Sequence, residues 1–199
     1  MLGGDLEGLK MAAKANVEIF GGHQVDFIIT DCGGCGAELK KYGHHLGGNS
    51  LAVSFSSRVR DISQILFERV DELKTVLKPL PLKITYHDPC HISHCQGIRN
   101  EPRKLLQIIP GIDYRELAEA DACCGSAGTY NIDRPDMSDK ILLRKVDNVG
   151  RTGAEYLVTS NPGCLLQLKA ALVNRTPEIK VIHITELLIM SVEEGRNSD

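Results

Sequence analysis

The sequence predicts an α/β protein of two repeated units, in which mostly parallel sheets are flanked by helices and the first unit is truncated. Two observations predict this fold class. Segments with apolar residues every three or four positions alternate with short apolar runs, an order typical of helices that cover parallel strands. In addition, residues 26–35 line up with residues 155–164, and each stretch leads through a short strand and a cysteine-containing turn into a helix.

The first part of the chain predicts two helices and one strand. An amphipathic helix is expected over residues 5–20 and a short apolar strand over residues 25–30. Residues 44–56 begin with a glycine-containing polar stretch, and we expect a loop there, near the boundary between the units. Apolar residues then recur at helical spacing, which predicts a long helix over residues 57–77.

The rest of the chain alternates regularly between strand and helix. Strands are expected over residues 82–87, 113–118, 156–160 and 179–184. Helices are expected over residues 101–109, 135–149 and 165–173 and from residue 185 onward. Pro135 fits this assignment, because proline suits the first turn of a helix. The two units are therefore expected to cover residues 1–56 and 57–199.

Composition and charge exclude several classes of protein. Hydrophobic residues make up 42% and charged residues 25% of the 199 residues, as in ordinary globular proteins. The net charge of -3 and the absence of Trp give no basis for nucleic-acid binding. No apolar run is long enough for a transmembrane segment, and the first residues do not resemble a secretory signal. Seven cysteines in such a chain favour a reducing compartment and metal or redox chemistry.

Four cysteines carry the functional prediction: Cys90, Cys123, Cys124 and Cys164. Each lies in a short segment rich in Gly, Pro or small residues, where the backbone can come close to a bound group. Two adjacent thiols suit one small metal ion poorly, but each can bind a different iron of a polynuclear cluster. The pattern therefore predicts an iron–sulfur cluster and a function in electron transfer.

Other interpretations compete with the cluster. A buried free cysteine often acts as a small hydrophobic residue, which explains one cysteine better than four at the ends of elements. A disulfide between Cys123 and Cys124 would be strained. Zinc is the stronger alternative, although structural zinc sites usually contain closely spaced pairs. Only Cys32 and Cys35 have that CxxC spacing, and they are further candidate metal ligands in the first unit.

Two small residues beside the cysteines are candidate contacts of the bound group. Gly125 adds no side-chain bulk, so backbone N–H groups can approach the cluster sulfurs. Asn161 aligns with Cys32 of the first unit, and it is expected to cap the following helix or to contact the cluster.

Three histidines surround Cys90 in the sequence: His87, His91 and His94. Hydrogen bonding within a loop is the commoner use of such residues, and we expect it here, with a ligand or proton-transfer role as the alternative. His91, which follows Cys90 directly, is the candidate contact of the cluster among them. Cys95 has no counterpart in the first unit and is expected to be incidental.

Several motifs in combination resemble the cysteine-rich (CCG) domain proteins. They are Tyr86-His-Asp-Pro-Cys-His, Gln96-Gly-Ile-Arg, Cys123-Cys-Gly-Ser-Ala-Gly-Thr-Tyr-Asn and Asn161-Pro-Gly-Cys. The nearest branch is the iron–sulfur subunit of bacterial glycolate oxidase. The cysteine-rich subunit of heterodisulfide reductase and the lactate-utilisation iron–sulfur proteins are more distantly similar. The resemblance covers nearly the whole chain and is strongest over residues 83–172.

The resemblance implies a particular set of ligands. The family pattern contains two copies of a lone Cys, a Cys-Cys-Gly and a closing CxxC. Residues 1–56 would be the C-terminal remnant of the first CCG unit, and residues 57–199 the complete second unit. Cys90, Cys123, Cys124 and Cys164 would hold a [4Fe–4S] cluster. Asn161 occupies the fifth cysteine position, so the choice between a cubane and a non-cubane cluster stays open, with zinc as the alternative.

The resemblance also implies a function and partners. The chain would be the iron–sulfur electron-transfer subunit, or a fragment of it, of a flavin-dependent 2-hydroxy-acid oxidase or dehydrogenase of the glycolate type. A separate flavoprotein subunit would carry out the substrate chemistry, and a ferredoxin-like module would continue the electron path, so no catalytic residue is expected in this chain. The expected location is the cytoplasm, with attachment to the inner face of the membrane through the complex. The alternatives are a heterodisulfide-reductase-like thiol–disulfide subunit and a zinc-binding or metal-free interaction module.

Overall fold

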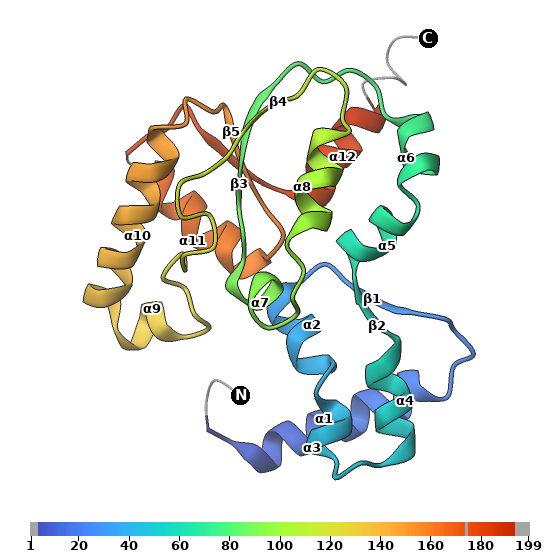
Figure 1. Ribbon diagram of the computed structural model, residues 1–199. Helices are drawn as coiled ribbons and strands as arrows, with labels where there is room; N and C mark the ends of the chain where they lie inside the picture. The colour runs from blue at the N-terminus through green and yellow to red at the C-terminus, as the bar shows by residue number, and fades with distance from the viewer. Residues whose placement is uncertain (1–3, 174, 194–199) are drawn as a thin grey trace. The chain divides into compact units, whose positions relative to one another are not determined.

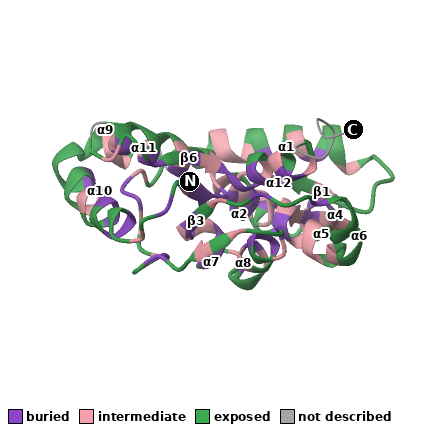
Figure 2. Cartoon of the chain, turned by 90° about the horizontal axis from the view of Figure 1, so that it is seen from above, coloured by how far each residue is buried: buried purple, intermediate pink, exposed green. Residues whose placement is uncertain are grey.

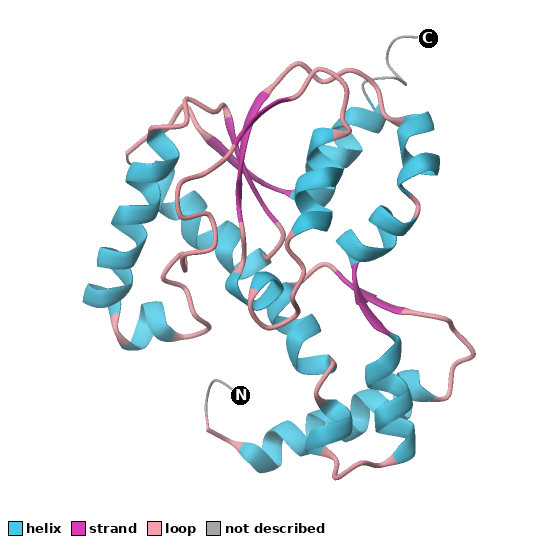
Figure 3. Ribbon diagram, viewed as in Figure 1, coloured by secondary structure: helices cyan, strands magenta, loops and turns pink. Residues whose placement is uncertain are grey.

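The computed structural model describes residues 4–173 and 175–193, and the chain forms two compact units, Met1–Ile62 and Ser63–Asp199. Helices and strands alternate in both units, and all strand pairs of the described residues are parallel (Figures 1 and 3). The predicted α/β fold class with parallel sheets and flanking helices is therefore confirmed. None of the described helices is both long enough and apolar enough to cross a membrane.

The first unit contains a two-stranded parallel sheet and four helices. In chain order its elements are α1 (Leu6–Gly21), β1 (Ile28–Thr30), α2 (Gly33–Leu39), α3 (Tyr42–His45), α4 (Ser50–Arg58) and β2 (Val59–Asp61). Helix α1 begins after Asp5, whose carboxylate accepts a hydrogen bond of 2.8 Å from the backbone N–H of Gly8. The stacked rings of Tyr42 and Phe55, 5.5 Å apart, lie in the core of this unit.

Two predictions for residues 44–77 are wrong. The expected loop over residues 44–56 is largely helical, because Asn49 caps α4 by accepting hydrogen bonds from Leu51 and Ala52. The expected helix over residues 57–77 is interrupted, since Val59–Asp61 pairs with β1 as strand β2. Helices α5 (Ile62–Glu68) and α6 (Val70–Val76) follow this strand.

The second unit has a four-stranded parallel sheet in the order β4-β3-β5-β6. Its strands are β3 (Lys83–His87), β4 (Asp113–Arg115), β5 (Tyr156–Thr159) and β6 (Lys180–His183). Beyond α5 and α6, its helices are α7 (Cys90–Ser93), α8 (Asn100–Gln107), α9 (Tyr130–Asp133), α10 (Pro135–Gly150), α11 (Pro162–Val173) and α12 (Ile184–Glu193). The predicted elements are thus present, and the short helices α7 and α9 were not predicted.

Helices cover both faces of this sheet (Figure 1). Leu157 of β5 packs among residues of α10 and α11, whereas the next residue, Val158, packs among residues of α8 and α12. This alternation is the two-residue period of a strand that is buried on both sides. Strands β3, β5 and β6 are accordingly buried along much of their length, whereas the edge strand β4 is not. The outer faces of α9 and α10 are exposed (Figure 2).

The strand order creates a natural binding position. The chain adds β4 to one side of β3 and then β5 to the other side, so the direction of winding reverses between β3 and β5. In parallel α/β sheets, ligands bind outside the carboxyl ends of the strands at such a switch point. The segment after β3 carries Cys90, and the segment after β5 carries Cys164. The fold therefore brings residues distant in sequence to one edge of the sheet.

Candidate metal centre

Cys90 is the first residue of α7, three positions after the end of β3. Its side chain is half-buried, and it hydrogen-bonds with the thiol of Cys123. The backbone N–H of His91 donates to the same sulfur, and Nδ1 of His91 lies 3.5 Å from Sγ of Cys90. His91 therefore contacts Cys90, and its contact with a bound cluster stays a prediction.

The adjacent pair, Cys123 and Cys124, lies in the loop between β4 and α9. The backbone N–H of Gly125 donates to Sγ of Cys123 at 3.3 Å, and that of Ser126 donates to Cys124. Gly125 has φ +90°, and a Cβ atom there would lie 2.6 Å from the carbonyl oxygen of Ser138. This position therefore requires glycine for both backbone conformation and space.

Cys164 lies in the first turn of α11 and is 5% exposed. Nδ2 of Asn161 donates to Sγ of Cys164 at 3.4 Å, and the thiol of Cys124 also hydrogen-bonds with this sulfur. The N-terminus of a 12-residue helix favours negative charge, which suits a thiolate. Asn161 thus contacts the cysteine that was expected to bind the cluster.

Together the four cysteines form one continuous series of sulfur contacts, from Cys90 through Cys123 and Cys124 to Cys164. Hydrogen bonding with Cys124 lowers the pKa of Cys123 to about 2 and the pKa of Cys164 to about 5. Hydrogen bonding with Cys123, together with burial, raises the pKa values of Cys124 and Cys90. Thiolate is the form that binds metal, so the environment favours ligand chemistry at two of the four sulfurs.

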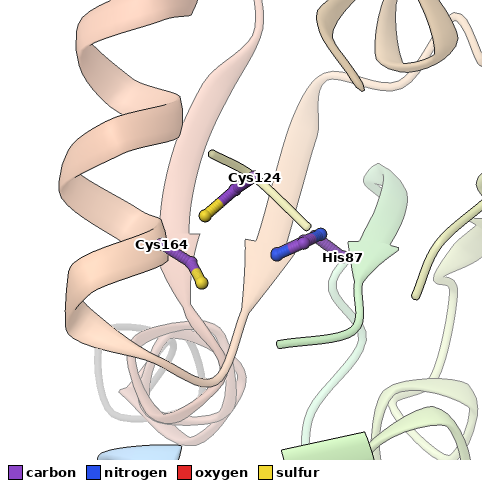
Figure 4. A group of neighbouring side chains, drawn as sticks. All are labelled: His87, Cys124 and Cys164. Carbon is purple, nitrogen blue, oxygen red and sulfur yellow. The ribbon is translucent and has the colours of Figure 1, made fainter. Parts of the chain in front are cut away.

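His87 is a member of this site that the sequence analysis did not identify. It ends β3, is fully buried, and has a ring nitrogen that lies within 4.8 Å of Sγ of Cys124 and of Cys164, which are themselves that close (Figure 4). The predicted hydrogen bond of His87 in a loop is wrong, since the residue is in a strand and neither ring nitrogen has a partner among the described residues. Its place at the end of an apolar strand, three residues before the candidate ligand Cys90, was the available signal.

Lys145 is a second residue that the sequence analysis missed. It is 2% exposed, and its ammonium donates to the backbone carbonyl oxygens of Glu119 and Ala120. Burial lowers its pKa, and the nearby Cys124 opposes that shift. Residue 145 lies about one helical turn after the buried Leu142, and therefore on the same face of α10. This spacing was the signal for its burial. Lys145 places a positive charge beside a group of thiolates.

The remaining candidates have other surroundings. Cys32 precedes α2 in the first unit, and its sulfur accepts a hydrogen bond of 3.5 Å from the backbone N–H of Cys35. Hydrogen bonding with Cys32, together with burial, raises the pKa of Cys35 to about 11. Cys95 is exposed, and Nε2 of His94 lies 3.3 Å from the carbonyl oxygen of Asp121. Within the described part of the second unit, His94 and Cys95 thus add no imidazole or sulfur to the series of four cysteines.

The donor set fits a metal cluster. The site offers the ligands that iron–sulfur clusters and zinc prefer: a series of four cysteine sulfurs in which each contacts the next, backbone N–H donors and a buried imidazole. Two of the sulfurs belong to adjacent residues, which allows each to bind a different iron atom. The arrangement can hold a redox-active group and shield one side of it from water.

Comparisons with known proteins agree with this arrangement. The family model "CCG: Cysteine-rich domain" matches residues 4–40 and 84–169, which include the four cysteines as well as Cys32 and Cys35. The expected resemblance to this family is confirmed.

Several curated proteins are similar over most of the chain. The probable glycolate oxidase iron-sulfur subunit of Bacillus subtilis is 38% identical over 90% of this chain and 42% of its own length. A subunit of the fumarate reductase (CoM/CoB) of Methanothermobacter marburgensis is 36% identical over 85% of this chain and 33% of its own length. Lactate utilization protein A of Oceanobacillus iheyensis is 32% identical over 96% of this chain and 79% of its own length. The chain thus spans less than half of the first two relatives.

Proposed function

We propose that this chain, which belongs to the cysteine-rich (CCG) domain family, binds a [4Fe–4S] cluster through Cys90, Cys123, Cys124 and Cys164 and transfers electrons as part of an oxidoreductase. The continuous contact of these four sulfurs at the switch point of the sheet carries the proposal. The names of the relatives support it, because two of them are iron–sulfur or reductase subunits. When bound, the cluster supplies one-electron oxidation and reduction.

The protein groups around the cluster would stabilise its negative charge. The backbone N–H groups of Gly125 and Ser126 and the side-chain amide of Asn161 donate to cysteine sulfurs. Hydrogen bonds to sulfur stabilise the reduced form more than the oxidised form, because the reduced cluster carries one more negative charge. The buried ammonium of Lys145 acts in the same direction. The site is therefore suited to accept an electron.

Electrons would enter or leave on the side of Cys90 and Cys123. These two cysteines are half-buried, whereas Cys124 and Cys164 are buried. A cavity of about 230 Å³ next to Cys123 is lined by the basic side chains of Lys140, Arg144 and Lys145, among others. An acidic surface of a redox partner suits this side of the second unit, because complementary charge steers association.

We infer the partners and the substrate class from the names of two relatives. A flavoprotein subunit would oxidise a 2-hydroxy acid such as glycolate or lactate, and this chain would pass the electrons to a ferredoxin-like iron–sulfur module. The complex would work in the cytoplasm or at the inner face of the membrane. Because the chain spans only part of its first relatives, it would supply one segment of their electron path.

The decisive experiment is anaerobic reconstitution with iron and sulfide, followed by metal analysis. We expect about four irons per chain and broad visible absorption. Cys124→Ala should lose most of the iron, because it removes the sulfur that contacts both Cys123 and Cys164. Cys95→Ala is the matched control, since this cysteine is exposed and lies outside the sulfur series. Stoichiometric zinc without iron, or equal iron in both variants, would refute the proposal.

A further inference from the structure

The imidazole of His87 is a fully buried polar group of the second unit. Its side chain has 0% relative exposure, and neither Nδ1 nor Nε2 has a hydrogen-bond partner within the described part of the chain. His183, also buried, differs because its Nδ1 lies 2.8 Å from the hydroxyl of Thr185. A buried polar atom without a hydrogen-bond partner destabilises the fold, and His87 has two such atoms among the described residues. The fold keeps this residue in place at a cost that its packing does not explain.

The position of the ring points to a bound group. Figure 4 shows a ring nitrogen of His87 directed toward the sulfurs of Cys124 and Cys164, and these three ligand atoms all lie within 4.8 Å of one another. The contact is not a hydrogen bond of normal geometry, although the ring lowers the pKa of Cys164 after the larger effect of Cys124. The three side chains come from β3, from the loop after β4 and from α11, so three separate elements converge on one point.

The neighbouring strand places a second unpartnered polar group at the register position of His87. His87 pairs with Thr159 across β3 and β5, and the hydroxyl of Thr159 is buried without a partner among the described residues. A histidine that binds a metal through one nitrogen usually has a polar partner near the other, which fixes the orientation of the ring. Thr159 is the residue on the neighbouring strand that offers such an atom.

We infer that His87 is a fifth protein ligand of the iron–sulfur cluster, bound through one imidazole nitrogen on the side of Cys124 and Cys164. The inference rests on the cluster proposed above and assigns a ligand beyond its four cysteines. A neutral imidazole is a common ligand of iron, and histidine ligands to iron–sulfur clusters are chemically established. The cluster would then have mixed sulfur and nitrogen coordination.

Pulsed electron paramagnetic resonance of the reduced, reconstituted protein tests this inference. With ¹⁵N-labelled histidine, a nitrogen bound directly to iron gives a strong hyperfine coupling, whereas a hydrogen-bonded nitrogen gives a weak one. We expect the strong coupling in the wild type and its loss in His87→Leu. His94→Leu is the matched control, because Nε2 of His94 lies 3.3 Å from the carbonyl oxygen of Asp121 and not at a cysteine sulfur, so this variant should leave the coupling unchanged.

A second variant separates ligation from a structural role. His87→Cys keeps a metal-binding atom at this position, so it should retain the iron content of the wild type while losing the nitrogen coupling. Iron-loaded wild type without a strongly coupled histidine nitrogen overturns the inference and leaves the proposed cluster intact. A coupling that survives His87→Leu overturns it in the same way. Wild type that takes up no iron refutes both the proposed function and the inference.

Discussion

Substitution of Gly125 by alanine should disrupt the metal site through the backbone. Gly125 has φ +90°, a conformation that costs an L-residue about 1–2 kcal/mol. The added Cβ would lie 2.6 Å from the carbonyl oxygen and 3.0 Å from the hydroxyl of Ser138. The 2.9 Å hydrogen bond from this hydroxyl to the carbonyl of Gly125 would then have to shift, at a further cost of about 1 kcal/mol. We expect a total loss of about 2–3 kcal/mol in the free energy of unfolding.

Gly153 provides the matched control for this experiment. It lies in the same unit and also has a positive φ, +64°, but a Cβ atom there would meet nothing within 4 Å. Gly153→Ala should therefore cost only the conformational part, about 1–2 kcal/mol. The difference between the variants isolates the clash with Ser138.

Urea unfolding followed by circular dichroism measures both variants, and metal analysis after reconstitution measures their iron content. Gly125→Ala should also bind less iron, because movement of residue 125 removes the 3.3 Å contact from its N–H to Sγ of Cys123. Gly153→Ala should bind iron like the wild type. If Gly125→Ala is no less stable than Gly153→Ala and binds as much iron, the glycine does not shape the site and the reasoning is wrong.

Two further predictions concern charges and hydrogen bonds near the site. Arg103 donates to both carboxylate oxygens of the buried Asp88, at 2.8 and 2.7 Å, so Arg103→Met should cost about 3–5 kcal/mol in urea unfolding by leaving that carboxylate unpaired. Arg115→Met, which breaks an exposed ion pair, is the control and should change stability little; equal effects would count against the buried pair. Asn161→Leu removes the N–H donor to Sγ of Cys164 and should make the midpoint potential of the cluster more negative, by about 40 mV for each kcal/mol of differential stabilisation. An unchanged potential in redox titration would show that this contact is lost when the cluster binds.

Three strands of the second unit could be predicted well because most of their residues are buried or half-buried. Apolar runs over residues 82–87, 156–160 and 179–184 need no distant information to be recognised as such strands, and they form β3, β5 and β6. The helix predicted over residues 57–77 failed for the opposite reason. Its apolar spacing fits a helix, but Val59–Asp61 pairs with Ile28–Thr30, and that distant partner is not visible in the local pattern.

The candidate metal site also combines residues that could be predicted from the sequence with a residue that could not. The four cysteines were identified by their types and by the small residues around them, and the fold places their sulfurs in one series of contacts. His87 could not be distinguished from His91 and His94 in the sequence. The direction of the His87 side chain depends on the face of β3 that it occupies. Its neighbours there, Cys124 and Cys164, come from elements that are distant in the sequence. Such convergence is set by the tertiary structure.

The Mössbauer spectrum of the protein reconstituted anaerobically with ⁵⁷Fe tests the central claim most directly. If Cys90, Cys123, Cys124 and Cys164 hold a [4Fe–4S] cluster, the spectrum should show irons of mixed valence coupled in one cluster, with about four irons per chain. Cys124→Ala should lose this signal while Cys95→Ala keeps it. Isolated high-spin iron in the wild type, or no bound iron at all, would contradict the claim.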